Sequence, residues 1–213
     1  MDQAFAELQR VTDRVWPNLA QAASTQGYQR FMFVSTEAGA GTSVMATSTA
    51  LGVTLNLRES VCLVEIGTAR PSVASYLGLP QTPGMSDVLD GRAPLEKALT
   101  EVAEHPGLSV LSGGSPRPAV RGELASESGR SLLGELSRRS KFLFFDCPPL
   151  LEHPETRVLL EYVDAAVLVL RARSTRKDTA QRALETLESA GIPVVGSILN
   201  RFRSDVPFQR DVE

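Results

Sequence analysis

The chain has 213 residues, of which 42% are hydrophobic, so it is long enough to bury a substantial core and short enough for one α/β domain. Its net charge of −3 gives no basic field that would favour nucleic acid as a partner. No apolar run approaches the roughly 18 residues of a membrane span, and the N-terminus lacks the basic-then-apolar order of a signal peptide, so we expect a cytoplasmic protein.

Residues 1–24 predict an amphipathic N-terminal helix, because four apolar residues fall on one stripe: Phe5, Leu8, Val11 and Val15. Pro17 is expected to kink or end this helix. Trp16 lies beside the stripe and suits two alternatives equally well. The helix either packs on its own domain or supports self-association with a neighbouring subunit.

A phosphate-binding loop is predicted within residues 31–46, where an apolar strand passes through a glycine-bearing turn into a helix. Gly39 and Gly41 let backbone N–H groups gather round a phosphate at the positive end of that helix. Ser43 stands where a hydroxyl would hold Mg²⁺. Thr42 stands where such a loop carries the lysine that reaches the outer phosphates.

Short continuous apolar runs, typical of strands buried on both faces, recur along the chain at residues 31–35, 61–66, 108–111, 141–145, 165–170 and 193–199. Helical patterns lie between most of them. The alternation predicts an α/β fold with a doubly wound, mainly parallel sheet and helices on both faces, a three-layer α/β/α architecture. This domain is expected to span residues 25–202, followed by a polar tail at residues 203–213.

Three local patterns complete this description. Residues 176–190 predict the clearest helix, where Thr175 with Asp178 resembles a capping box. Residues 112–127 are rich in Gly, Pro and Ser and predict a surface loop. The arginine-rich run at residues 171–177 is interpreted as a solvated loop and helix start in preference to an anion-binding or partner surface.

Asp146 follows four consecutive apolar residues, so we expect it at the carboxyl edge of the sheet, where ligands bind in open α/β folds. Taken alone, Asp146 suits two interpretations equally well: it caps the end of the strand, or it holds Mg²⁺ through water. The nearby loop favours the metal role. Cys62 and Cys147 are predicted to be buried thiols, and His105 and His153 lack a partner at metal-ligand spacing.

These features together resemble the MinD/ParA-like P-loop ATPases, and within them the bacterial tyrosine kinases that partner polysaccharide co-polymerases in capsule and exopolysaccharide export. Beyond the loop, the resemblance rests on residues 70–72, 77–80, 83–91, 108–114, 145–149, 163–164, 171–175 and 196–202. The stretch PGMSDVLDG at residues 83–91 is typical of the kinase subgroup. The resemblance covers nearly the whole chain and implies a P-loop NTPase-like domain.

Against that family the catalytic positions are degenerate. The kinase loop reads roughly PGxGKS and this one reads AGAGTS, so Thr42 removes the cation that neutralises the outer phosphates. The kinases end their second strand in an Asp-x-Asp motif, where this chain has Glu65 and Gly67. Glu37 replaces the lysine that partition ATPases carry near the start of the loop. No residue is therefore assigned a catalytic role.

Binding positions are better kept than catalytic ones. The resemblance assigns nucleotide binding to Gly39, Ala40, Gly41, Thr42, Ser43 and Asn200, with Asn200 on the adenine side. It assigns Mg²⁺ to Ser43 and Asp146. No cofactor is required on this interpretation, and Mg-ATP or Mg-ADP binds weakly if it is retained. Arg70, or an arginine from a partner, is the candidate substitute for the lost lysine, since Lys97, Lys141 and Lys177 are expected away from the site.

Family features of substrate and assembly are also incomplete. The kinases usually end in a tyrosine cluster, which the tail of this chain lacks, and Tyr28, Tyr76 and Tyr162 are expected to be packing residues. The family's oligomer motif on the first helix, Glu-x-x-Arg-x-x-Arg, is present only in part, at Glu7 and Arg10.

We therefore expect a pseudokinase or pseudo-ATPase that acts as a regulatory or scaffolding partner of an inner-membrane polysaccharide co-polymerase, held at the membrane face through that partner. One alternative is a weakly active ATP-binding ATPase or tyrosine kinase of the same pathway. Another is a MinD/ParA-type spatial regulator, which Glu37 and the short tail disfavour.

Overall fold

The computed structural model describes residues 2–67, 69–117 and 121–201 and, of residues 2–12 and 121, the backbone alone. The predicted polar tail at residues 203–213 lies outside this part of the chain. The side chains of the partial oligomer motif and of the first part of the apolar stripe lie outside it as well.

The strands of the described residues form one seven-stranded sheet in the order β3-β4-β2-β5-β1-β6-β7. Every neighbouring pair is parallel except β3 with β4. The predicted doubly wound, mainly parallel sheet is confirmed, while the short antiparallel strand β3 occupies residues that lacked a strand signal. The strands are β1 (Arg30–Ser35), β2 (Val61–Glu65), β3 (Leu99–Glu101), β4 (Leu108–Leu111), β5 (Phe142–Asp146), β6 (Ala165–Arg171) and β7 (Val194–Asn200).

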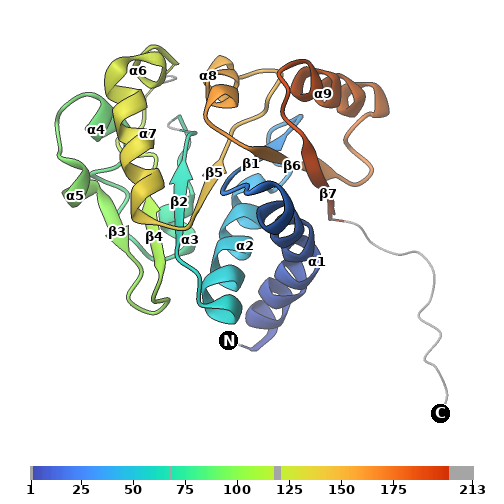
Figure 1. Cartoon of the computed structure of the whole chain (residues 1–213), viewed down its shortest axis with the longest axis horizontal. Coiled ribbons are helices and arrows are strands. Elements are labelled where there is room, and N and C mark those ends of the chain that lie inside the picture. The colour runs from blue at the N-terminus through green and yellow to red at the C-terminus, as the bar shows by residue number, and fades with distance from the viewer. Residues whose placement is uncertain (1, 68, 118–120, 202–213) are drawn as a thin grey trace.

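Helices cover both faces of this sheet (Figure 1). They are α1 (Asp2–Gln26), α2 (Thr42–Leu57), α3 (Val73–Tyr76), α4 (Met85–Leu89), α5 (Leu95–Ala98), α6 (Arg121–Ala125), α7 (Glu127–Arg139), α8 (Pro154–Val158), the 3-10 turn η1 (Leu159–Glu161) and α9 (Lys177–Ser189). None of the described helices combines the length and the apolar character needed to cross a membrane.

Two hydrophobic cores, one on each face, explain why the strand sequences are apolar without alternation. Phe31 and Phe33 of β1 pack in the core beneath α1, α2 and α3. Met32 and Val34 of the same strand pack in the opposite core with side chains from α4 to α9. Because successive side chains of a strand point to opposite faces, a strand covered on both sides must be apolar at every position.

Helix α1 runs unbroken from Asp2 to Gln26, so the expectation that Pro17 ends it is wrong. Proline removes one backbone hydrogen bond, and buried Val15 and Leu19 on either side hold the helix on the core beneath it. Trp16 packs edge-on against Phe142, with ring centroids 5.4 Å apart. This contact places the helix on its own domain, the first of the two alternatives.

Two local predictions are corrected by tertiary contacts. Residues 112–127 are not simply a surface loop, because Ser112 is buried and the segment contains α6. Thr175 does not cap α9, because the N-cap is Arg176 and no side chain makes a capping hydrogen bond there. The Thr175 hydroxyl instead donates to Oε1 of Glu37 at 2.8 Å.

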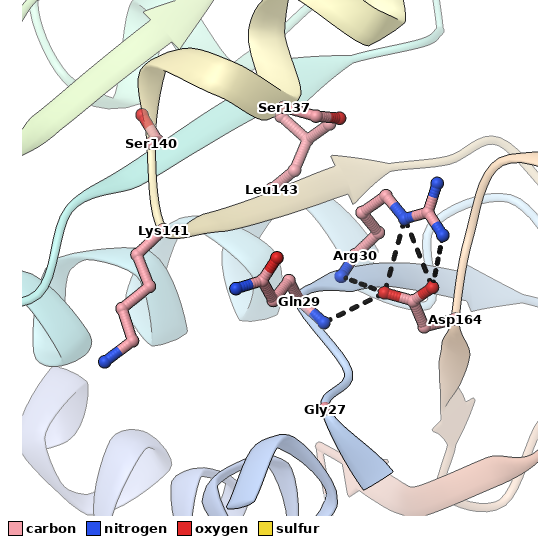
Figure 2. A pocket seen from close by; sticks show the side chains of 8 residues that line it. All are labelled: Gly27, Gln29, Arg30, Ser137, Ser140, Lys141, Leu143 and Asp164. Carbon is pink, nitrogen blue, oxygen red and sulfur yellow. Dashed lines mark hydrogen bonds and ion pairs between the residues drawn. The ribbon is translucent and has the colours of Figure 1, made fainter.

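A cavity of about 270 Å³ lies at the amino edge of the sheet, lined by Arg30 and Asp164 among others (Figure 2). Arg30 pairs with Asp164, Nη2 to Oδ1 at 2.5 Å, and the amides of Gln29 and Arg30 donate to the same carboxylate. Burial raises the pKa of Asp164, but these hydrogen bonds outweigh it and hold that pKa below its usual value. Lys141 also lines this cavity, at the edge expected for it, and pairs with Glu59.

Candidate phosphate-binding cleft

A cleft with a volume of about 520 Å³ opens at the carboxyl edge of the sheet. It is lined by the loop before α2, by the ends of β2 and β5 and by the segments that follow those strands. Register brings the acids at those ends together, since Glu65 of β2 pairs directly with Asp146 of β5. The predicted loop and the predicted metal ligand therefore share one cleft.

The loop has the backbone shape of a phosphate cradle. Gly39 and Gly41 have φ values of +75° and +95°, in the left-handed region that glycine adopts readily. Gly41 is the N-cap of α2, so the positive end of a 16-residue helix faces the cleft. Thr42 begins that helix and is 8% exposed, and its neutral side chain supplies no charge for an outer phosphate.

Asn200 is also brought to the loop, from the end of β7. Its Nδ2 donates to the carbonyl of Ala40 at 2.7 Å, and a Cβ added at Gly41 would lie 2.1 Å from the same nitrogen. Glycine is therefore required at position 41 for both conformation and space. Ala40 itself is buried beneath the loop, against Met45 and Val169.

Ser43 and Asp146, the two predicted Mg²⁺ positions, line the same cleft. Asp146 is 4% exposed. Burial raises its pKa to about 8, with the Ser43 hydrogen bond acting against the shift and the charge of Glu65 adding to it. A carboxylate that is this poorly stabilised in its ionised form suits a divalent cation, which would restore the missing positive charge.

Glu65 has a structural role in this arrangement. Its Oε1 accepts from the amides of Ser72 and Val73, and its Oε2 accepts from the amide of Gly113 at 2.8 Å. Burial raises its pKa, and these three amide bonds oppose the increase. Both oxygens are committed to the backbone, so the carboxylate holds two loops in place and leaves Asp146 as the acid that faces a metal.

Gly67 lies at the rim of the cleft with no heavy atom within 4 Å of the position that a Cβ would occupy. An aspartate would fit there without displacing a neighbour. The space beside Gly67 is therefore open among the described residues.

Glu37 lines the cleft at the start of the loop and is bound to the segment between β6 and α9. Its two oxygens accept from the hydroxyls of Ser174 and Thr175 at 3.2 and 2.8 Å. The Arg171 guanidinium comes within 4.0 Å of the Cβ position of Gly39. Arg171 thus reaches the phosphate loop, while Arg173, Arg176 and Lys177 are exposed, as expected for a solvated loop and helix start.

The cleft also contains titratable side chains that were not predicted as site residues. His153 and Glu155 line the cleft after β5, and Tyr76, expected to be a packing residue, is 55% exposed there. Tyr28 and Tyr162, by contrast, do pack on the cores. The sequence signal for the first two is the His-Pro-Glu triplet shortly after Asp146, which lacks the spacing typical of metal ligands.

Arg70, the in-chain candidate for a substitute cation, is an exposed residue on the cleft wall. The described residues therefore suit Mg²⁺ through Ser43 and Asp146 and suit phosphate through the loop amides. They provide no lysine for the outer phosphates. The site fits a bound nucleotide better than it fits phosphoryl transfer.

No family model matches the chain. It is 29% identical over 143 residues to tyrosine-protein kinase ptk of Acinetobacter johnsonii, covering 67% of this chain and 19% of that kinase. It is 27% identical over 183 residues to tyrosine-protein kinase YwqD of Bacillus subtilis, covering 86% of this chain and 76% of that one.

Solved structures of similar fold also include a bacterial kinase domain. The VpsO kinase domain superposes with a TM-score of 0.82 and 26% identity, covering 95% of this chain and 98% of that domain. The septum site-determining protein MinD of Pyrococcus horikoshii, complexed with Mg-ADP, superposes with a TM-score of 0.68 and 23% identity, covering 83% and 72%, which shows the shared fold. The chain is therefore a homologue of the bacterial tyrosine kinases, with the fold of the MinD-like P-loop ATPases.

Proposed function

We propose that this chain is a catalytically degenerate relative of the bacterial tyrosine kinases that acts through binding. In this role it is a regulatory or scaffolding partner of an inner-membrane polysaccharide co-polymerase in exopolysaccharide or capsule biosynthesis, held at the membrane face by that partner. The observation that supports this proposal is that the loop keeps the backbone of a phosphate cradle but has Thr42 where such loops carry a lysine.

Electrostatics explains why this combination favours binding over transfer. Phosphoryl transfer depends on positioning and on cations that neutralise the outer phosphates. The described residues of the cleft wall include one exposed cation, Arg70. They also include the carboxyl groups of Glu37, Glu65 and Asp146. The loop amides and Ser43 can still hold a Mg-nucleotide, which supports a conformational or docking role.

The first test is calorimetric titration of Mg-ATP and Mg-ADP, with turnover measured in parallel. We expect weak binding and no turnover by the unmodified chain, and a gain in both for the Thr42→Lys, Gly67→Asp double variant. Position 67 has room for the acid. Thr42→Gln is the matched control, similar in length to lysine but uncharged. Micromolar affinity with measurable turnover by the unmodified chain would overturn the pseudoenzyme proposal.

The second test concerns the partner. The cytoplasmic ends of the co-polymerase encoded nearest to this chain should co-purify with it, and the Thr42→Gln variant should co-purify equally. Genes for glycosyltransferases and a polysaccharide exporter are expected beside it. If such ends fail to bind in both nucleotide-loaded and nucleotide-free conditions, the scaffolding half of the proposal is wrong.

A weakly active ATP-binding protein of the same pathway is the second candidate. The presence of Ser43 and Asp146 in one cleft favours it, because both Mg²⁺ positions are kept. A MinD/ParA-type spatial regulator is less favoured, because Glu37 replaces the lysine at the start of the loop and its carboxylate is bound to Ser174 and Thr175.

A further inference from the structure

We propose that His153, held by the buried Glu155, donates a hydrogen bond to the outer phosphate of a nucleotide on the loop, and that the imidazole takes up a proton when this ligand binds. The inference rests on the proposed retention of nucleotide binding. It adds a cation to the site from outside the loop.

His153 is placed in the right cleft. It is the N-cap residue of α8, in the segment that follows β5, and it lines the same cavity as Ser43 and Asp146. Its side chain is 35% exposed. The ring is therefore accessible to a group bound between the loop and the end of β5.

Glu155 orients the ring. The Nδ1 atom of His153 lies 2.9 Å from Oε1 of Glu155. An ionised carboxylate only accepts hydrogen bonds, so Nδ1 carries the proton and Nε2 is left as the atom that can take another. A second proton turns Nε2 into a donor, and a charge-assisted bond to phosphate is of the strong kind.

The environment of Glu155 leaves this carboxylate short of partners. Its side chain is 5% exposed, and its other oxygen, Oε2, is buried with no hydrogen-bond partner among the described residues. Glu65 in the same cleft differs, because both of its oxygens accept backbone amides. A buried carboxylate with one oxygen unbonded is stabilised by a neighbouring positive charge, which an imidazolium supplies.

The other groups around the cleft set the sign of the expected effects. Asp146 at the end of β5 and Glu65 at the end of β2 contribute negative charge or a bound proton. Arg70 and Tyr76 line the wall after β2, and the first turn of α2 presents Thr42 and Ser43, which are uncharged. Mg²⁺ binding at Asp146 releases a proton, opposite in sign to uptake at His153, so the two must be separated experimentally.

The test uses pyrophosphate as the probe, without Mg²⁺, titrated into the full chain by calorimetry at pH 7 in buffers of different ionisation heat. Wild type is expected to take up a proton on binding and to bind more tightly at pH 6 than at pH 8. His153→Gln is expected to remove most of the uptake, leaving the part that arises from Asp146, and to weaken binding at pH 6 by about 5- to 10-fold. Glu155→Gln is expected to reduce the uptake.

His105→Gln is the matched control, since the chain has 2 histidines and His105 lies between β3 and β4, away from the cleft. It should leave uptake and affinity unchanged. Ring NMR provides a second readout: the titration midpoint of His153 should rise when pyrophosphate is added, and that of His105 should not.

Equal proton uptake by wild type and His153→Gln would overturn the inference, as would the absence of pyrophosphate binding at pH 6. The proposed function fails on different readouts, namely turnover by the unmodified chain or loss of co-purification with the co-polymerase ends.

Discussion

Asp164 at the amino edge of the sheet and Asp146 at its carboxyl edge both lie beside β1, yet their surroundings shift their pKa values in opposite directions. Asp164 accepts hydrogen bonds from the Arg30 guanidinium and two backbone amides, and its pKa is lowered. Asp146 is buried beside Ser43 and close to Glu65, and its pKa is raised to about 8. Asp164 stabilises the fold. Asp146 is unfavourable in its ionised form, and a bound cation would stabilise that form.

The difference teaches how to separate structural charges from functional ones in this fold. A charge that serves structure has its partners within the chain, as Asp164 and Glu65 do. A charge that serves a ligand lacks part of its complement until the ligand arrives, and buried Asp146 and Glu155 fit that description. Four substitutions test this division.

Asp164→Ala is expected to have the largest effect, a loss of about 2–4 kcal/mol in the free energy of unfolding at pH 7. The substitution leaves the Arg30 guanidinium and two backbone amides without their acceptor. The lowered pKa predicts that wild type loses this contribution only as pH falls below about 4. Urea unfolding measures both. Asp178→Ala, which removes an exposed pair with Arg176, is the control and should be indistinguishable from wild type.

Glu65→Gln is expected to lower the free energy of unfolding by about 2 kcal/mol, because the amide has one acceptor oxygen where three backbone N–H groups now find partners. Thermal unfolding measures the loss. Exposed Glu101→Gln on β3 is the control. An unchanged stability would mean that Glu65 is free for a ligand after all and would move it to the functional side of the comparison.

Asp146→Asn is expected to stabilise the chain, by about 1–3 kcal/mol at pH 8. The folded pKa is raised, so the folded state keeps a proton that the unfolded chain releases above about pH 4. Wild-type stability therefore declines as pH rises from about 4 toward 8, and the neutral side chain avoids that decline. The denaturant midpoints of wild type and Asp146→Asn should be similar at pH 4 and should differ at pH 8. A destabilised variant at pH 8 would contradict the assignment.

Lys141→Met is expected to have the smallest effect, below about 0.5 kcal/mol, because surface ion pairs contribute little. The Lys141 and Glu59 side chains are 48% and 35% exposed. Chemical unfolding at low and high salt measures it, with Glu59→Gln as the partner substitution. If Lys141→Met lowers the free energy of unfolding as much as Asp164→Ala does, then the exposure of a charge at the amino edge does not predict how much it stabilises the fold.

Much of the fold followed from local patterns. The apolar runs at residues 31–35 and 61–66 match strands covered on both faces, and the glycine-bearing turn matches a loop with two positive φ values. These features depend on neighbours along the chain, so periodicity and residue type were sufficient. The positions of Ser43 and Asp146 in one cleft followed from the rule that parallel strands present their carboxyl ends at a common edge.

What the sequence determined by itself is the architecture and the presence of a neutral threonine, Thr42, at the end of the glycine-bearing turn, because both can be read from residue types and spacing. Only the tertiary structure decided which acids are structural. Glu65 is bound by amides from two separate loops, Thr175 donates to Glu37 across 138 positions, and His153 meets Glu155 inside the cleft. A carboxylate's role depends on the donors that folding brings to it, and those donors come from segments distant in sequence.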